Sequence, residues 1–529
     1  MKIKSLIVLL LLILNSSCKK STKNNIEIRT VVKENAIAMD SSYIKNYHPR
    51  VFEFYKSNHF NTIWFNETNR EMYLAFLENI DEDGLNPNEY WINSITKNIE
   101  DFKQLSPEEI TNLDALLSKS FLKLANNIHS GKLNPRNLYS DWEITPDQLI
   151  NPEKILQKAI SNNKITFVLD SLRPANKIYK KLRETLRDYK EVDSDSSSIA
   201  NLKISINKKI VLNDTNNKLY NIKLKLTYLD LFEPEVCITN IYTKQLEESV
   251  KKLQLTHNLT PDGVIGLSTI KALNRSKNYK KNQIIANLER LRWFPRNLGE
   301  NYVMVNIPEF RLWLIADEDT IVTKKIIVGK IERKTPILSS KFSNIVFNPT
   351  WTVPPTILKK DLVPAAMKDS NYFHKNRIKI YENGIVVTPS EWQSMYSNRY
   401  RYVQDPGKNN SLGIIKFNFP NKHLVYLHDT NTRSAFSRDG RDLSSGCVRV
   451  ADPLKLAVDL FKLDGNSAIT LEKIQEIIKS EETKSIKIKN PIYIHQFYWT
   501  VSIDQNNEIK YNDDIYNLDV PLYNALQIQ

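Results

Sequence analysis

The chain has 529 residues, more than a single hydrophobic core usually serves, so its length predicts two to four domains. It is 41% hydrophobic, 10% aromatic and 25% charged, a composition that excludes a largely disordered protein. The net charge of +14 fits a polyanionic envelope or a membrane surface. Because the basic residues are spread along the chain without interleaved aromatics, we expect no nucleic-acid partner.

The N-terminus carries an export pattern. Two lysines precede an apolar run over residues 6–14, which is too short to span a bilayer, and Asn15-Ser16-Ser17-Cys18 follows. This resembles a bacterial lipoprotein signal over residues 1–18. The resemblance implies that Cys18 becomes the lipidated first residue after cleavage and that residues 19–40 form a tether. The alternative is an ordinary secretory signal. We expect a membrane-anchored lipoprotein of the cell envelope, on its periplasmic side.

Residues 41–200 have the pattern of a helical scaffold. In the segment 114–128 apolar residues recur every three or four positions and form one stripe. Turn sequences around Gly84 and Gly131 separate the expected helices. This region shows no acid–base pair, metal cluster or phosphate-binding loop, so we expect it to be structural.

Residues 203–275 form a second predicted unit. A helix with Leu253-Gln254 near its end leads into the turn Asp262-Gly263-Val264-Ile265-Gly266, followed by a short helix over 268–273. The pattern resembles the three-helix peptidoglycan-binding domain, and we expect both glycines to supply positive φ in the turn. The module either binds glycan or is kept for packing alone.

From about residue 281 the pattern changes to strands. Alternation predicts strands over 302–307, 311–316, 321–328 and 413–419, and a strand over 424–427 that delivers His428 at its end. Proline excludes Trp351-Thr352-Val353-Pro354-Pro355 from the centre of a sheet. Residues 356–411 form a polar insertion with aromatic residues. After Cys447, Asp452 is the expected N-cap of a helix, and the last fifty or so residues, 476–529, return to short strands.

Cys447 is the residue that calls for a chemical role. Cysteines are otherwise limited to Cys18 and Cys237, and Cys237 lies in an apolar stretch and is expected to be buried. A thiol attacks a carbonyl as thiolate and needs a base, for which histidine is suited. His428 is the nearest histidine in sequence, and it lies at the end of a predicted strand that can face this loop.

The glycine before the nucleophile is also informative, because the chain has only 12 glycines. Gly446 permits a backbone in which neighbouring amides converge on a developing oxyanion. Ser444 and Ser445 are expected to hold the loop through bonds from their side chains to the backbone.

The block Tyr426-Leu427-His428-Asp429 … Ser444-Ser445-Gly446-Cys447-Val448-Arg449 resembles the catalytic signature of the L,D-transpeptidases of the YkuD superfamily, in particular the long periplasmic YcbB-like branch. The likeness extends to the stretch 287–293, to Trp351-Thr352-Val353-Pro354-Pro355 and to 412–417. It implies a multidomain α+β fold: a helical N-terminal scaffold, a small three-helix peptidoglycan-binding-like module and a mainly-β YkuD-type catalytic domain over 281–475. The insertion 356–411 would cap the substrate, and 476–529 would pack on the scaffold or the catalytic domain.

The resemblance also implies roles. Cys447 would be the nucleophile and His428 the general base, oriented by the backbone carbonyl of Asp429, with the Asp429 side chain as a rival orienter. Gly446, Ser445 and Arg449 would support the oxyanion or the loop, Arg449 either by binding a substrate carboxylate or by bracing the loop. Tyr426 and Trp351 would line the substrate cleft, unless they pack in the core. No cofactor and no metal are expected.

The expected reaction is L,D-transpeptidation, which forms 3→3 peptidoglycan cross-links through a Cys447 thioester with tetrapeptide stems and releases D-alanine. Carbapenem-type inhibitors would acylate the same thiol. Two variants use the same acyl-enzyme: hydrolysis by an L,D-carboxypeptidase and attachment of a protein to peptidoglycan. The alternative of another class is a non-enzymatic lipoprotein that anchors to peptidoglycan through residues 203–275.

Overall fold

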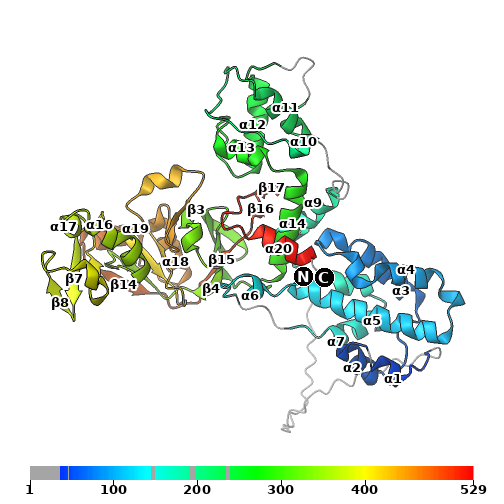
Figure 1. Cartoon of the computed structure of the whole chain (residues 1–529). Coiled ribbons are helices and arrows are strands. Elements are labelled where there is room, and N and C mark those ends of the chain that lie inside the picture. The colour runs from blue at the N-terminus through cyan, green and yellow to red at the C-terminus, as the bar shows by residue number, and fades with distance from the viewer. Residues whose placement is uncertain (1–35, 46, 145–148, 190–197, 234–238, 528–529) are drawn as a thin grey trace, which may run out of the picture.

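The structure is a computed structural model that describes residues 36–45, 47–144, 149–189, 198–233 and 239–527. The expected signal peptide, the lipidation site Cys18 and Cys237 lie outside these residues. Three lobes are visible in Figure 1: a helical lobe from the N-terminal part, a small green helical lobe, and a β-rich lobe at the opposite side from the first. The helices α14 and α20 lie where the lobes meet.

The N-terminal lobe is helical, as predicted. Its long central helix, α5, begins with a capping box in which Ser106 and Glu109 satisfy each other's backbone N–H groups. The predicted apolar stripe of α5 lies in the lobe's own core, where Leu117, Phe121 and Leu124 are fully buried. The helices are α1 (Ser41–Ile44), α2 (Pro49–Ser57), α3 (Glu67–Glu78), α4 (Ile92–Glu100), α5 (Pro107–Ser130), α6 (Pro135–Leu138), α7 (Pro152–Ser161), α8 (Ile165–Asp170) and α9 (Lys177–Asp188).

The small lobe contains α10 (Ser198–Asn201), α11 (Leu219–Tyr228), α12 (Lys244–Thr256) and α13 (Leu267–Leu273) around a separate apolar core. Gln254 organises the turn: its amide oxygen accepts from the Gly263 N–H and its Nε2 donates to Asp262 Oδ1, both at 2.9 Å. Gly263 has φ +73°, as expected. The expectation for Gly266 was wrong, because its φ of −103° is open to other residues and a Cβ there would meet nothing within 4 Å.

Several polar contacts join the small lobe to the β-rich lobe and the C-terminal segment, and Asn258 Nδ2, for example, donates to the Glu309 carbonyl at 3.1 Å. Thr260 donates to Asp439 through its hydroxyl at 2.7 Å and its N–H at 3.2 Å. Lys271 and Arg275 both pair with Asp513. The contact of Thr260 joins the module's turn to the segment that leads toward Cys447.

The segment expected to begin the strands is instead a helix, α14 (Lys277–Arg292). It was missed because nearly all of its last nine residues are buried, polar ones included, so no amphipathic stripe marks it. Arg292 pairs with Glu289 at 2.7 Å and donates to the Asp83 carbonyl of the N-terminal lobe. Arg290 pairs with Asp519 at 2.5 Å. This helix therefore holds the scaffold and the C-terminal segment against each other.

One sheet forms the β-rich lobe, in the order β14-β5-β10-β11-β13-β3-β2-β1-β15-β4, with β12 paired to β3. The predicted strands β1, β2, β3 and β10 are present, but the strand expected over 424–427 is reduced to the two residues of β11. The strands are β1 (Asn301–Asn306), β2 (Arg311–Ala316), β3 (Asp319–Gly329), β4 (Leu338–Lys341), β5 (Asn344–Phe347), β10 (Ile415–Asn418), β11 (Leu427–His428), β12 (Asp442–Ser444), β13 (Val448–Val450), β14 (Lys484–Lys487) and β15 (Tyr493–Phe497).

Helix α18 (Pro453–Leu463) packs its buried residues, among them Leu456 and Phe461, into the core of this lobe. Asp452 is its N-cap residue, as expected, but it has φ +43° and makes no capping bond through its side chain. Helix α19 (Leu471–Lys479) follows.

The C-terminal segment completes the sheet of the β-rich lobe rather than packing on it from outside. β14 pairs with β5, and β15 lies between β1 and β4. A separate hairpin, β16 (Val501–Ile503) and β17 (Ile509–Tyr511), and helix α20 (Asp519–Gln527) continue toward α14.

The insertion folds as a unit at the far end of the β-rich lobe (Figure 1). Its four-stranded sheet has the order β6-β9-β7-β8 and its own apolar core, to which Tyr402 and Trp392 contribute, joined by a 2.7 Å hydrogen bond. Trp351 and Thr352 form an edge strand, as the prolines that follow them predicted. The elements are β6 (Trp351–Thr352), α15 (Pro355–Ile357), α16 (Val363–Ala366), α17 (Tyr372–Lys375), β7 (Ile378–Glu382), β8 (Ile385–Val387) and β9 (Arg401–Gln404).

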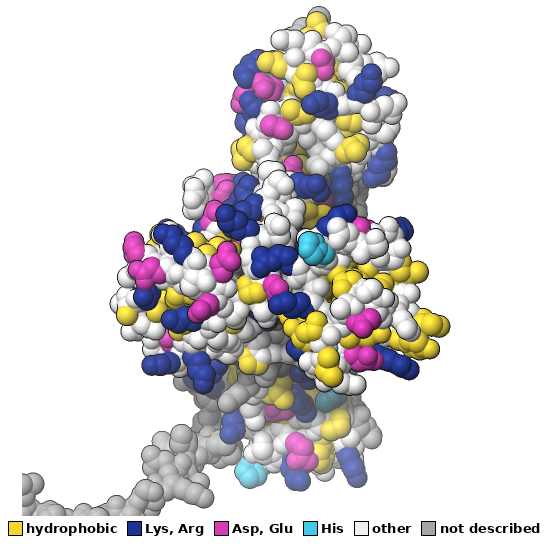
Figure 2. Space-filling view, turned by 90° about the vertical axis from the view of Figure 1, so that its left-hand side faces the viewer, with side chains coloured by type: hydrophobic (Ala, Val, Ile, Leu, Met, Phe, Trp, Pro, Cys, Tyr) yellow, Lys and Arg dark blue, Asp and Glu magenta, His cyan; other side chains and the backbone are white. Residues whose placement is uncertain are grey.

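Basic side chains are dispersed on the face of the molecule that Figure 2 shows, where they alternate with acidic and apolar ones. Among the helices that the structure describes, none has the length and apolar character needed to cross a bilayer.

Candidate active site

Strand register brings the two predicted catalytic residues to one face of the sheet. β11 pairs in parallel with β13, with Leu427 beside Val448 and His428 beside Arg449. The pairing continues one residue upstream, where the Val448 N–H donates to the Tyr426 carbonyl at 3.1 Å. Because side chains alternate along a strand, His428 and Arg449 share a face with Tyr426 and Cys447, opposite to the buried Leu427 and Val448.

His428 is held in one orientation by the residue that follows it. Its Nδ1 lies 2.5 Å from the Asp429 carbonyl oxygen. Since a carbonyl only accepts, Nδ1 carries the proton and Nε2 keeps a free lone pair in the neutral ring. The Asp429 side chain points elsewhere: its Oδ2 accepts from the Ile414 N–H at 3.1 Å and pairs with Arg433. Of the two orienters left open by the sequence, the structure places only the carbonyl at His428.

Cys447 is partly buried beside Tyr426. The Tyr426 hydroxyl donates to its sulfur and the Tyr426 N–H donates to it as well. Trp351, at the edge of the insertion, is the second hydrogen-bond partner of the Tyr426 side chain. The Tyr426 ring lies edge-on to His428, with centroids 5.6 Å apart. Tyr426 and Trp351 therefore lie in the site with Cys447, and neither is fully buried.

Both candidate catalytic groups are held neutral. Burial lowers the pKa of His428 to about 3, and the positive charges of Arg449 and Lys416 add to the effect. Burial also raises the pKa of the Cys447 thiol, although the Tyr426 hydrogen bonds and the two cations oppose the rise. A neutral imidazole with a free Nε2 can accept a proton from a thiol at the moment of attack.

The loop before Cys447 has the predicted glycine geometry. Gly446 has φ +111°, a conformation that residues with a side chain rarely adopt. Ser444 fixes the loop, because its hydroxyl donates to the Cys447 carbonyl at 2.5 Å and accepts from the Gly446 N–H at 3.2 Å. The Gly446 N–H is therefore already engaged. Within the described residues the Cys447 N–H has no hydrogen-bond partner, which makes it the better candidate for an oxyanion donor.

Ser445 does not hold the backbone as expected. It is exposed, and its hydroxyl accepts from Arg333 at 2.7 Å. The same guanidinium pairs with Asp361 of the insertion at 2.6 Å and 3.1 Å. This three-residue link connects the loop before Cys447 to the insertion. No pattern in the sequence indicated this link, because the three residues are far apart along the chain.

Two cations flank His428 on the same face. Arg449 is its neighbour on β13, and Lys416 is its neighbour on β10. The buried Nε of Arg449 has no hydrogen-bond partner in the described structure, and no acidic side chain described there forms an ion pair with Arg449. Lys416 was not singled out from the sequence. The alternation in Ile415-Lys416-Phe417 was the available signal, since both apolar neighbours are buried on the other face.

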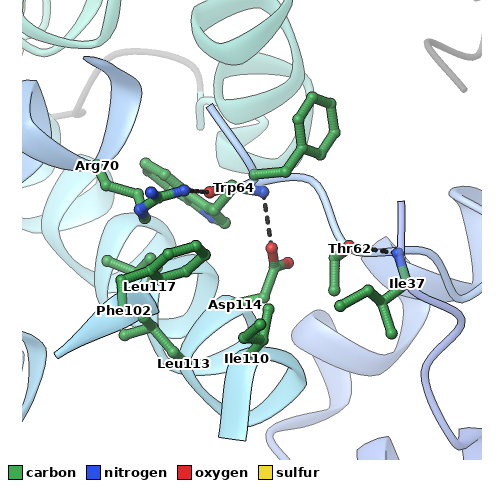
Figure 3. Close-up of a pocket in the computed structure, with 10 residues that line it drawn as sticks. Ile37, Thr62, Trp64, Arg70, Phe102, Ile110, Leu113, Asp114 and Leu117 are labelled. Carbon is green, nitrogen blue, oxygen red and sulfur yellow. Dashed lines mark hydrogen bonds between the residues drawn. The ribbon is translucent and has the colours of Figure 1, made fainter. Parts of the chain in front are cut away.

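A cavity of about 200 Å³ lies elsewhere, in the scaffold (Figure 3). Its two charged residues are hydrogen-bonded to the backbone of Trp64: Asp114 accepts from the Trp64 N–H at 2.7 Å, and Arg70 donates to the Trp64 carbonyl at 2.7 Å. None of the residues around Cys447 lines it. No group of three or more His, Cys, Asp or Glu side chains placed to hold a metal occurs among the described residues.

Family comparisons divide the chain as the geometry does. Residues 49–186 match the model described as "Scaffold domain", residues 215–273 the "Putative peptidoglycan binding domain" and residues 300–460 the "L,D-transpeptidase catalytic domain" of the YkuD family. Both His428 and Cys447 lie in the last range.

A protein of Haemophilus influenzae named "Putative L,D-transpeptidase" is 33% identical over 288 residues, which are 53% of this chain and 57% of that protein. The match thus spans a little over half the length of this curated relative.

Solved structures give a weaker likeness. An L,D-transpeptidase from Xylanimonas cellulosilytica is 12% identical, with 56% of this chain and 100% of that one covered, at a TM-score of 0.17. One from Stackebrandtia nassauensis is 11% identical, with 54% and 94% covered, at 0.19. TM-scores this low do not indicate a shared overall fold. On the family matches and the sheet architecture, the chain carries an L,D-transpeptidase catalytic domain of the YkuD family, joined to a peptidoglycan-binding domain and a scaffold domain.

Proposed function

We propose that the protein is a cysteine acyltransferase that forms 3→3 cross-links in peptidoglycan. The observation that carries the proposal is the arrangement of His428, whose Nδ1–H is fixed on the Asp429 carbonyl and whose ring lies on the face of the sheet that bears Cys447. A non-enzymatic anchor would have no use for a buried neutral histidine oriented in this way.

The proposed reaction has two halves. In the first, Cys447 Sγ attacks the carbonyl of the third residue of a tetrapeptide stem while His428 Nε2 takes the thiol proton. The amide bond breaks, His428 returns the proton to the departing amine, and D-alanine leaves. In the second, the side-chain amine of another stem attacks the thioester, loses a proton to His428 and releases the thiol. The Cys447 N–H is the proposed oxyanion donor.

The insertion is the proposed cap over the donor peptide. Its edge residue Trp351 bonds to Tyr426, and its Asp361 is tied through Arg333 to Ser445. These contacts join the insertion to both sides of the nucleophile. A cap in this place would keep water from the thioester and so favour the amine over hydrolysis. Hydrolysis by an L,D-carboxypeptidase and attachment of a protein remain the variants that use the same acyl-enzyme.

The setting proposed for this activity is the cell envelope, on the periplasmic side, with a lipid on Cys18 holding the chain at a membrane. The export pattern and the match to a peptidoglycan-binding domain support it. Carbapenem-type compounds are the expected inhibitors, because their strained carbonyl would take the place of the stem peptide at Cys447.

Trapping the acyl-enzyme tests the proposal. The purified protein is mixed with disaccharide-tetrapeptide, quenched in acid and analysed by intact mass spectrometry. A gain of the donor mass minus D-alanine, mapped to Cys447, is expected, and a carbapenem should add one drug mass at the same residue. If the protein binds peptidoglycan but neither reagent modifies Cys447, the anchoring alternative holds instead.

A further inference from the structure

We propose that Lys416 forms an anion subsite beside Cys447 and takes a carboxylate of the donor peptide, so that substrate binding itself readies His428 as a base. The inference rests on the proposed function and adds to it the group that recognises the charge of the donor. It starts from the row Lys416, His428 and Arg449, which strand pairing sets side by side across β10, β11 and β13.

Lys416 lies close to the nucleophile. Its Nζ stands 3.9 Å from the centre of the Tyr426 ring, whose hydroxyl donates to Cys447. A cation over a tyrosine face is held by the ring's quadrupole, which fixes the position of the charge without neutralising it. Lys416 is also partly exposed, so a ligand in the cleft can reach it.

The acidic groups around this row are all directed elsewhere. Asp429 is turned to the Ile414 N–H and Arg433, and Asp361 is paired with Arg333. No carboxylate of the described residues forms an ion pair with Lys416 or Arg449. Partial burial makes the positive charge of Lys416 costly, and its pKa is lowered mainly for that reason. Two partly buried cations without a counter-ion form a site that gains from binding an anion.

The donor peptide supplies such anions near the bond that breaks. One is the terminal carboxylate of the departing D-alanine, and the other is the free carboxylate on the diamino-acid side chain. Both belong to the same chemical class, and each can be removed separately by converting it to an amide. The free protein holds His428 neutral partly through the charges of Lys416 and Arg449. A bound carboxylate would cancel those charges, which makes His428 more basic only when a donor is present.

Alkylation of Cys447 tests the anion subsite without any need for turnover. Iodoacetate and iodoacetamide form the same S–C bond with loss of iodide, but only iodoacetate is negatively charged. The ratio of the iodoacetate rate to the iodoacetamide rate at Cys447 is measured by peptide mapping. The thiolate fraction cancels in this ratio, which therefore reports the local attraction for an anion. We expect the ratio to fall about tenfold in Lys416→Met and to recover in Lys416→Arg.

The matched control is Lys341→Met, since Lys341 also lies on a strand over a tyrosine ring, 4.9 Å from the centre of Tyr493, but away from Cys447. It should leave the ratio unchanged. A ratio that is the same in wild type and Lys416→Met would overturn the anion subsite, as would an equal fall in the control.

Two analogue donors identify the carboxylate. In one the terminal D-alanine is a carboxamide, and in the other the side-chain carboxyl of the third residue is amidated. For the carboxylate that Lys416 binds, the amide should raise KM about tenfold in wild type and add nothing in Lys416→Met. If both analogues lose a further tenfold in the variant, Lys416 does not bind a substrate carboxylate. If wild type acylates no donor at all, the proposed function fails while the alkylation ratio still decides the subsite.

Discussion

The Nδ1 of His428 donates to the backbone carbonyl of Asp429 at 2.5 Å, while the carboxylate of the same Asp429 accepts from the Ile414 N–H. The orientation of His428 therefore depends on main-chain geometry, and the acidic side chain that looks catalytic in the sequence acts as a brace for the turn at Gly413. A Cβ on Gly413 would lie 2.3 Å from Asp429 Oδ2, which shows how tightly that turn is packed.

Replacing Asp429 by alanine should accordingly cost stability more than chemistry. Loss of a buried acceptor for a backbone N–H predicts a destabilisation of about 1–3 kcal/mol, seen as a lower Tm. Asp429→Asn, which keeps one acceptor oxygen, should lose less. kcat measured well below Tm should fall less than about tenfold in Asp429→Asn. A loss of a thousandfold in kcat at unchanged Tm would show that the carboxylate itself orients His428.

The thiol should titrate as an ordinary buried thiol. The pKa of His428 is lowered to about 3 and that of Cys447 is raised, so both are neutral at pH 7 and no thiolate–imidazolium pair forms in the free protein. The iodoacetamide rate at Cys447 should therefore rise about tenfold per pH unit between roughly pH 6 and 8. His428→Gln should give a profile of the same shape. A flat profile from about pH 5 upward would demonstrate the ion pair and contradict this assignment.

Gly446→Ala should abolish acylation of Cys447 in addition to lowering stability through backbone strain. A side chain at φ +111° costs of the order of 1–3 kcal/mol, and the new Cβ would stand 3.4 Å from the Lys334 carbonyl. The matched control is Gly384→Ala, which has φ +86° in the β7–β8 hairpin and open space around its Cβ. Both variants should lower Tm, but only Gly446→Ala should abolish acylation of Cys447. Equal residual acylation in the two would mean that the loop geometry is unimportant.

The link from Arg333 to Ser445 and Asp361 should affect what happens to the thioester more than how it forms. Arg333→Ala frees the insertion from the loop before Cys447. Both partners of the guanidinium, Asp361 and Ser445, are exposed, which limits the effect on stability. We expect a larger share of hydrolysed tripeptide relative to cross-linked dimer, at an acylation rate within about threefold of wild type. Asp361→Asn should shift the partition in the same direction. An unchanged partition in both would remove the argument that this link closes the cap.

Much of the fold and the centre of the site could be predicted from local pattern. Alternation located β1, β2 and β3, and the stripe in α5 located the scaffold core, because the apolar residues of each recur with the period of the element over part of its length. Positive φ at Gly446 followed from residue type. These features depend on near neighbours in the chain, which is why a single sequence contains them.

What could not be predicted depends on contacts between distant segments. The second half of helix α14 is buried on all sides by other parts of the chain, so its polar residues Arg290 and Arg292 hid the helical pattern. Lys416 gains its place only from the register of β10 against β11. The orientation of Asp429 was undecided for the same reason, since its partner Ile414 lies on another segment.

Product analysis with and without the thiol tests the central claim most directly. Wild type and Cys447→Ala, matched by Tm, are incubated with disaccharide-tetrapeptide and the muropeptides are analysed by mass spectrometry. Wild type should yield a cross-linked dimer that has lost one D-alanine, and Cys447→Ala should yield none. The same products from both proteins, or no product from wild type at any donor concentration, would contradict transpeptidation through Cys447.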